Sequence, residues 1–172
     1  MNSKSREYLF VDGYNIINAW EKLRNLTQVN LDSARNELIE IMSEYQAYTG
    51  INVIIVFDAY QVRGNNYNEK TIKGVKVVYT KEKETADQFI ERTVDNMGKR
   101  RKIKVATSDW IQQQIVLGRG ASRISARELE LEIDSIKRKI KRKRKKEKET
   151  NEMLMGRLDP KLIEKLEKWR KD

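Results

Sequence analysis

Short apolar runs at four places in this chain end in, or are soon followed by, acidic residues. These acidic residues are Asp12, Asp58, Glu84 with Asp87, and Asp109. Continuous apolar runs that alternate with helical patterns are typical of buried strands in a parallel sheet. Ligands of such open α/β sheets bind beyond the carboxyl ends of the strands. We therefore expect the acidic side chains to converge on one edge of the sheet.

Clustered carboxylates repel one another unless a cation compensates their charge. Oxygen ligands are those that Mg²⁺ selects, and two such ions about 4 Å apart can activate water and stabilise the leaving oxygen of a phosphodiester. The sequence thus favours metal-dependent phosphodiester chemistry. Taken singly, each aspartate has an alternative interpretation as a helix cap or an Asx turn.

Four further residues lie close to these aspartates in the sequence. Asn15 could orient a carboxylate or a phosphate oxygen, or it could cap a helix. Gly13 is expected to allow a tight turn after the first strand. Ser108 could cap the following helix or bind a water on the metal, and Thr107 is expected to be structural.

The chain of 172 residues contains no histidine and no cysteine. Histidine general-base catalysis, thiol nucleophiles, disulfides and zinc sites built on Cys or His are therefore excluded. The first residues, MNSKSR, contain no signal-peptide core, and no apolar stretch approaches transmembrane length. We expect a soluble, cytoplasmic protein without membrane contact.

Positive charge is concentrated in the C-terminal third of the chain. Residues 1–118 contain 17 basic and 15 acidic residues, whereas residues 119–172 contain 19 and 11. This asymmetry suggests a polyanionic partner, most often nucleic acid, and a solvated helix face is the alternative. Because its charges would repel one another in isolation, we expect the densest run to become ordered against RNA or the ribosome. Its basic residues are Lys137, Arg138, Lys139, Lys141, Arg142, Lys143, Arg144, Lys145 and Lys146.

Hydrophobic periodicity divides the chain into alternating strands and helices. Strands are predicted at 8–11, 52–57, 75–79 and 103–106, and helices at 15–23, 31–48, from 86 to beyond 94, at 109–117, from 126 into 141–149, and from 160. Capping boxes at Thr85/Gln88 and Ser125/Glu128 begin two of these helices. Gly50 is a helix stop, and residues 63–68 form a polar loop. The pattern predicts an α/β domain over 7–136 and a basic helical extension over 137–172.

Four segments of the sequence resemble a known family. They are DGYNII from Asp12, FDAY from Phe57, ETADQ from Glu84 and TSD from Thr107. Together, over about residues 7–150, they resemble the NYN domain, a branch of the PIN-like nucleases, and within it the YacP type, bacterial endoribonucleases that associate with ribosomes. The resemblance implies a Rossmann-like, three-layer α/β/α sandwich with a mainly parallel sheet. It further implies that Mg²⁺ or Mn²⁺ is held by Asp12, Asp58, Asp87 and Asp109, with Asn15 and Glu84 assisting.

Basic residues that follow strand ends on the carboxylate side could receive the RNA backbone. They are Arg63, Lys81 and Lys83, with Arg119 and Arg123 less directly placed, whereas residues 99–102 precede a strand and are expected on the opposite face. Tyr14, Tyr60 and Trp110 lie within two residues of an acidic position and could stack on unpaired bases. We expect Trp110 to pack in the core instead.

These features predict a metal-dependent endoribonuclease that cleaves single-stranded mRNA, in association with the ribosome, by metal-activated attack of water. A non-catalytic RNA- or ribosome-binding factor on a nuclease scaffold is the alternative. The acidic residues argue against it, since negative charge facing a phosphate backbone does not help binding. A phosphatase or nucleotidase is a third hypothesis, although the chain lacks a glycine-rich phosphate loop.

Overall fold

A computed structural model of the protein describes residues 6–59, 68–98, 101–157 and 159–170. Its strands form one sheet in the order β3-β4-β2-β1-β5-β6, in which every neighbouring pair is parallel except β3 with β4. The strands are β1 (Glu7–Asp12), β2 (Asn52–Phe57), β3 (Asn68–Ile72), β4 (Val75–Tyr79), β5 (Lys102–Ala106) and β6 (Ser122–Ile124).

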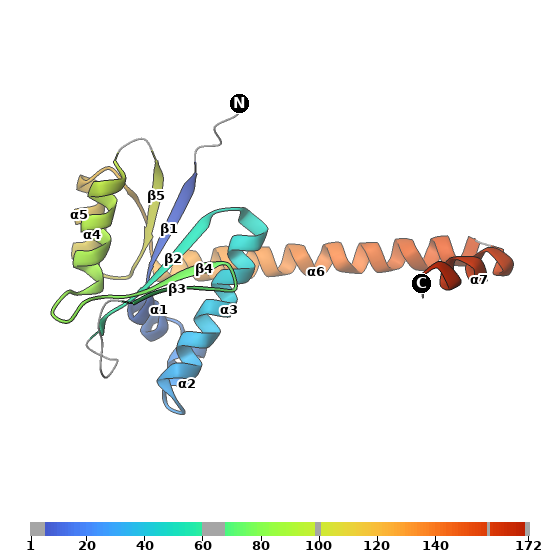
Figure 1. Ribbon diagram of the computed structural model, residues 1–172, viewed down its shortest axis with the longest axis horizontal. Helices are drawn as coiled ribbons and strands as arrows, with labels where there is room; N and C mark the ends of the chain where they lie inside the picture. Colours follow the sequence, from blue (N-terminus) through green and yellow to red (C-terminus); the bar gives the residue numbers. More distant parts are fainter. Residues whose placement is uncertain (1–5, 60–67, 99–100, 158, 171–172) are drawn as a thin grey trace. The chain divides into compact units, whose positions relative to one another are not determined.

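Helices cover both faces of this sheet (Figure 1). Over the described residues, the helices of the chain are α1 (Gly13–Ala19), α2 (Glu21–Thr27), α3 (Leu31–Thr49), α4 (Ala86–Met97), α5 (Trp110–Gly118), α6 (Ala126–Arg157) and α7 (Pro160–Trp169). Because successive strand residues point to opposite faces, Phe10, Ile54 and Val56 join a core with residues of α4 and α5. The expected three-layer α/β/α sandwich with a mainly parallel sheet is confirmed.

The four strands predicted from apolar runs are present, and two more were not predicted. β3 and β6 have the sequences NEKTI and SRI, which contain no apolar run, and most of their residues are exposed or half-buried. β3 forms a hairpin with β4 through Lys73 and Gly74, both with positive φ, as a two-residue turn of the hairpin type requires. Neighbouring strands, rather than a hydrophobic pattern, define these two edges of the sheet.

The helix predicted at 15–23 is wrong, because the chain breaks at Trp20. Trp20 has an extended backbone between α1 and α2, and its buried indole N–H donates to the carbonyl of Ala126 at 2.8 Å. A buried indole needs a hydrogen-bond partner, and this distant one is not visible in local periodicity. The Thr85/Gln88 and Ser125/Glu128 capping boxes and the Gly50 stop are confirmed.

Two compact units make up the chain, residues 1–133 and 134–172, and α6 begins in the first and continues through the second. In the basic part of α6, Lys143, Lys145 and Lys148 each pair with a glutamate one turn later, at 3.9–4.0 Å. Such pairs stabilise a helix by about 0.2–0.5 kcal/mol each. The basic run is helical in this structure, and its expected ordering against RNA or the ribosome stays a prediction. Over the described ranges, no helix is long and apolar enough to span a membrane.

Candidate active site

Four aspartates lie beyond the carboxyl ends of the central strands. Asp12 is the last residue of β1, Asp58 directly follows β2, and Asp109 lies three residues after β5. Asp87 is in the first turn of α4, which follows β4. Because β1 lies between β2 and β5, Asp12 is at the centre of this edge.

The carboxyl groups of Asp12 and Asp87 are hydrogen-bonded to one another. Burial and then the negative charge of Asp87 raise the pKa of Asp12 to about 7, and the nearby backbone N–H of Asn15 acts in the opposite direction. Burial also raises the pKa of Asp87, although the hydrogen bond from Asp12 lowers it. Both carboxyl groups are therefore harder to ionise than an ordinary aspartate.

Asp109 and Asp58 lie within the electrostatic range of this pair. The charge of Asp109 raises the pKa of both Asp12 and Asp87, and the charge of Asp58 raises that of Asp87. Asp109 also has the alternative role considered for each aspartate, because its Oδ1 caps α5 by accepting from the backbone N–H groups of Ile111 and Gln112 at 2.8 and 3.2 Å. Asp12 is the N-cap residue of α1, and the backbone N–H of Asn15 in the first turn lies near its carboxyl group.

The aspartates fit a hard divalent cation in their chemistry. Their only donor atoms are oxygens, and the raised pKa values of Asp12 and Asp87 reflect burial and mutual repulsion, which a cation would relieve. Among the described residues, no three carboxylates converge closely enough to hold one ion together. Mg²⁺ usually binds through one or two carboxylates and keeps several waters, so the Asp12–Asp87 pair meets its requirement.

Asn15 fixes the loop that carries Asp109. Its side-chain oxygen accepts from the backbone N–H of Ser108 at 2.6 Å, which connects the start of α1 to the loop after β5. Within that loop, the Thr107 hydroxyl accepts from the backbone N–H of Asp109 at 3.1 Å. Asn15 is therefore a positioning residue here, and Thr107 is structural as expected.

Thr80 holds the loop that carries Asp58, as Asn15 holds the loop that carries Asp109, and this role was not predicted from the sequence. Its fully buried hydroxyl accepts from the backbone N–H of Ala59 at 3.0 Å and donates to the carbonyl of Glu84 at 2.6 Å. It thereby joins the loop that carries Asp58 to the connection that leads to Asp87. A threonine directly after an apolar run was the only signal in the sequence.

Gly13 has a different role from the one expected. It begins α1 rather than forming a turn, and a Cβ at this position would lie 2.4 Å from the ring of Phe57. The glycine thus allows the end of β2 to pack directly against the start of α1, immediately after Asp12.

Comparison with known proteins agrees with this architecture. The sequence profile of the YacP-like NYN domain matches residues 9–171. The chain belongs to the YacP-like NYN family. It is 43% identical over 168 residues to the uncharacterized protein YacP of Bacillus subtilis (strain 168), covering 96% of this chain and 97% of that protein. The crystal structure of Rae1 (YacP) from Bacillus subtilis matches with a TM-score of 0.72 and 41% identity, over 96% of this chain and 95% of that one. A mutant of the same protein matches with a TM-score of 0.72 and 42% identity, over 83% and 84%.

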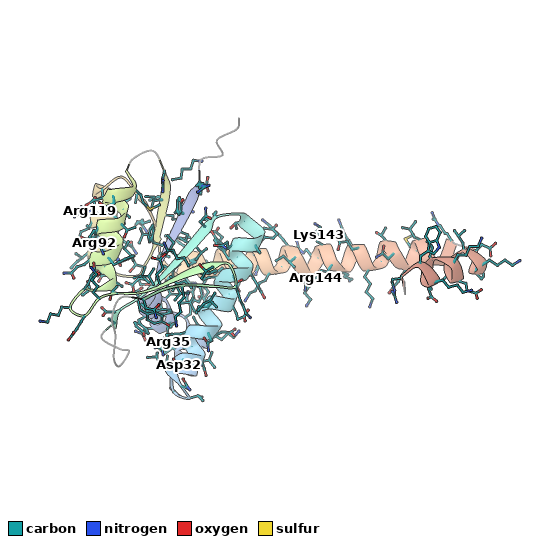
Figure 2. All side chains as sticks on the ribbon, in the orientation of Figure 1. Asp32, Arg35, Arg92, Arg119, Lys143 and Arg144 are labelled. Carbon is teal, nitrogen blue, oxygen red and sulfur yellow. The ribbon has the colours of Figure 1, made fainter. Side chains whose placement is uncertain are left out.

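In this YacP-like NYN protein, Glu84 forms an ion pair with Arg92 of the helix that follows it. Arg92 of α4 donates from Nε and Nη2 to Oε1 of Glu84 at 3.2 and 2.8 Å, and Figure 2 shows Arg92 on α4. The other oxygen, Oε2, is buried and has no hydrogen-bond partner among the described residues. The expected assistance of Glu84 to the aspartates therefore stays a prediction.

Tyr14 was expected to stack on an RNA base, but its ring is buried. It is 8% exposed, its ring packs against Phe57 with centroids 5.0 Å apart, and its hydroxyl accepts from Arg35 at 2.8 Å. A buried ring has no free face for a base, so the stacking role of Tyr14 is wrong. Arg35, which also pairs with Asp32 (Figure 2), is a cation near this edge that the sequence did not single out.

The basic residues predicted for RNA differ in their surroundings. Lys81 and Lys83 are exposed on the connection between β4 and α4, where they can meet a phosphate. Arg119, labelled in Figure 2, pairs with Glu91 and Asp95 of α4, so its charge is already compensated. Tyr60 and Arg63 lie outside the described residues. The residues of the basic run are all exposed or half-buried on α6, with Lys143 and Arg144 labelled in Figure 2.

Trp110 is not in the core, contrary to expectation. It is the first residue of α5 and is 66% exposed. Its exposure could not be foreseen from local pattern, because a tryptophan at the start of a short apolar helix normally packs inward.

Proposed function

We propose that this protein is a divalent-metal-dependent endoribonuclease that cleaves single-stranded mRNA in the cytoplasm, in association with the ribosome. The observation that carries the proposal is the half-buried, hydrogen-bonded Asp12–Asp87 pair at the carboxyl edge of β1, within the field of Asp58 and Asp109. Membership of the YacP-like NYN family supports a nuclease-related function.

In this proposal Asp12 and Asp87 hold Mg²⁺ or Mn²⁺, with Asp58 and Asp109 completing the set directly or through water. When bound, the ion would activate water and stabilise charge on the leaving oxygen. Metal binding requires deprotonated ligands, so both Asp12 and Asp87 would be ionised when the ion is bound, despite their raised pKa values.

The remaining residues orient the site and the substrate. Asn15 and Thr80 hold the loops that carry Asp109 and Asp58 in place. Lys81 and Lys83 offer exposed ammonium groups to the phosphate backbone on the Asp87 side. A phosphate that approaches four carboxylates is repelled unless such cations compensate, so these lysines favour binding more than chemistry.

With no histidine or cysteine, we propose direct attack of water on phosphorus, without a covalent intermediate. This route leaves a 5′-phosphate and a 3′-hydroxyl. Attack by the RNA's own 2′-hydroxyl would leave a 2′,3′-cyclic phosphate instead. A substrate with 2′-deoxyribose at the scissile position remains cleavable by the first route and resists the second, and mass spectrometry of the products distinguishes them.

The exposed basic residues of α6 support RNA and the ribosome as partners. Neutralising phosphates with Lys and Arg releases counterions and makes binding strongly salt-dependent. Family membership is consistent with these partners, and the charge of residues 119–172 supplies the physical means.

The test is incubation of the purified protein with single-stranded RNA, alone and with translating ribosomes, in Mg²⁺ and in EDTA. Internal cleavage in Mg²⁺ that EDTA abolishes is the expected result. Binding to RNA or ribosomes without cleavage under any condition would favour the non-catalytic factor. Hydrolysis of mononucleotides with intact RNA would favour a nucleotidase.

A further inference from the structure

The start of α5 presents two large apolar side chains to solvent. Trp110 and Ile111 are 66% and 69% exposed. Single exposed apolar residues are normal on protein surfaces, but here a tryptophan and an isoleucine are adjacent. They directly follow Asp109, and consecutive Cα atoms are only about 3.8 Å apart. The apolar pair is thus at the rim of the aspartate cluster.

In the first turn of α5 the pattern of exposure is the reverse of what the hydrophobic effect favours, although Val116 further along the helix is buried in the core. While Trp110 and Ile111 face water, Gln112 and Gln113 are buried at 1% and 5% exposure. The amide of Gln113 donates to the carbonyl of Thr107 at 2.7 Å, but neither amide atom of Gln112 has a partner within the described residues. A buried amide without a hydrogen bond is destabilising, because it loses its hydrogen bonds to water without replacing them. Folding alone therefore does not explain this arrangement, and such local conflicts are expected at functional sites.

The arrangement is held rigidly in relation to the aspartates. Asp109 caps the first turn of α5, Asn15 holds the backbone of Ser108, and Gln113 holds Thr107. Trp110 is consequently presented at a fixed position beside the carboxylates. A phosphate is a poor occupant for this position, because the neighbouring Asp109 is negative and its side chain already accepts from the N–H groups of Ile111 and Gln112 at the helix end.

We propose that Trp110, flanked by Ile111, is a stacking platform for an unpaired nucleobase of the RNA whose backbone lies at the Asp12–Asp87 pair. This inference rests on the proposed function. Every base has an apolar π-face, and stacking on an aromatic side chain is sequence-tolerant. Complementary charge for the same strand comes from the exposed Lys81 and Lys83. Because bases inside a duplex have no free face, the platform selects single-stranded substrate.

Binding and fluorescence can be measured in EDTA, where cleavage is not expected. In the full-length protein carrying Trp169→Phe, the remaining exposed tryptophan of the described residues is Trp110, since Trp20 is buried. A single-stranded RNA oligonucleotide should quench its fluorescence, whereas an abasic oligonucleotide of equal length and charge, or a duplex, should not. Trp110→Ala should weaken single-strand binding about 5- to 150-fold, and Trp110→Phe should largely retain it.

Tyr48→Ala is the matched control. Tyr48 is an exposed aromatic near the end of α3, just before β2 begins, and therefore at the opposite edge of the sheet. It should leave binding unchanged. Unchanged melting temperatures of the Trp110 variants will show that weaker binding does not come from unfolding.

Equal quenching by abasic and natural RNA, unchanged affinity in Trp110→Ala, or no RNA binding by the parent protein would overturn the platform. The two proposals fail separately. Metal-dependent cleavage without base stacking would support the proposed nuclease function and contradict the stacking platform. Base-specific quenching without cleavage in Mg²⁺ would support the stacking platform and contradict the nuclease function.

Discussion

The Asp12 carboxyl is half-buried at the end of the central strand and lies close to Asp87, so its ionisation opposes folding. In the unfolded chain this group has a pKa near the ordinary 3.8, whereas in the folded protein the pKa is raised to about 7. Between these values the folded protein binds a proton that the unfolded chain has released. The associated stability is complete below about pH 4 and is lost as the pH rises through 7.

We therefore predict that the metal-free protein is less stable at pH 8 than at pH 5. Each unit of pKa shift corresponds to about 1.4 kcal/mol, and the shift of Asp87 acts in the same direction. Urea unfolding in EDTA at the two pH values measures the effect, and Asp12→Asn should remove most of it. Millimolar Mg²⁺ should restore stability at pH 8 in the parent protein. Equal pH dependence in the variant and the parent would contradict this account.

Thr80 supplies a second prediction at this scale. Thr80→Val removes a buried hydroxyl that serves the backbone of Ala59 and Glu84, and should cost about 1–3 kcal/mol of unfolding free energy because both groups lose their partner. Thr93→Val is the control, since that hydroxyl bonds only to the carbonyl of Phe89 in its own helix. Chemical denaturation should show a larger loss of unfolding free energy for Thr80→Val than for Thr93→Val. Equal losses in the two variants would show that Thr80 has no special role.

At the scale of elements, the sequence predicted those parts of the fold that local patterns determine. The buried central strands are apolar runs, and α4 begins at a capping box that only local residues form. β3, β6 and the break at Trp20 depend on distant partners, so local periodicity could not predict them. The location of the four aspartates at one edge of the sheet followed from the parallel order of the strands. The buried state of Tyr14 and the exposure of Trp110 depend on how each helix is rotated against the sheet.

The packing of β2 against α1 gives a prediction about neighbouring elements. Gly13→Ala forces a Cβ to 2.4 Å from the Phe57 ring, and overpacking of this kind costs about 1–3 kcal/mol. Gly118→Ala is the control, because nothing lies within 4 Å of the place in α5 where its Cβ would sit and alanine favours a helix. Thermal unfolding should show a lower melting temperature for Gly13→Ala and no decrease for Gly118→Ala. A neutral Gly13→Ala would mean that the ring moves away freely.

At the scale of the whole molecule, charge is divided between the two units. The aspartates belong to residues 1–133, and the dense basic run belongs to residues 134–172. Chemistry and affinity should therefore be separable by mutation. The sequence alone predicted this division, because it is a property of composition.

Replacing Lys139, Arg142, Lys143 and Lys146 by glutamine should weaken RNA or ribosome binding and reduce its dependence on salt. The slope of log affinity against log salt should fall by about 0.7 for each single-strand phosphate that the variant no longer neutralises. The control replaces three paired lysines by glutamine and should leave the slope unchanged. These are Lys22, Lys73 and Lys76, which pair with Glu37, Glu40 and Glu69. An unchanged slope in the first variant would show that the basic run is not the binding element.

The most direct test of the central claim is the rate of Mg²⁺-dependent mRNA cleavage, with translating ribosomes present, by the parent protein and by Asp87→Asn. The substitution keeps the size of the side chain and removes one of the two hydrogen-bonded carboxyls. We predict that cleavage falls about 100-fold or more, on the scale of removing one essential electrostatic group, while folding is retained. Asp134→Asn, which changes an exposed aspartate of α6, should cleave at the parent rate. Full activity of Asp87→Asn, or cleavage that persists in EDTA, would contradict the proposed active site.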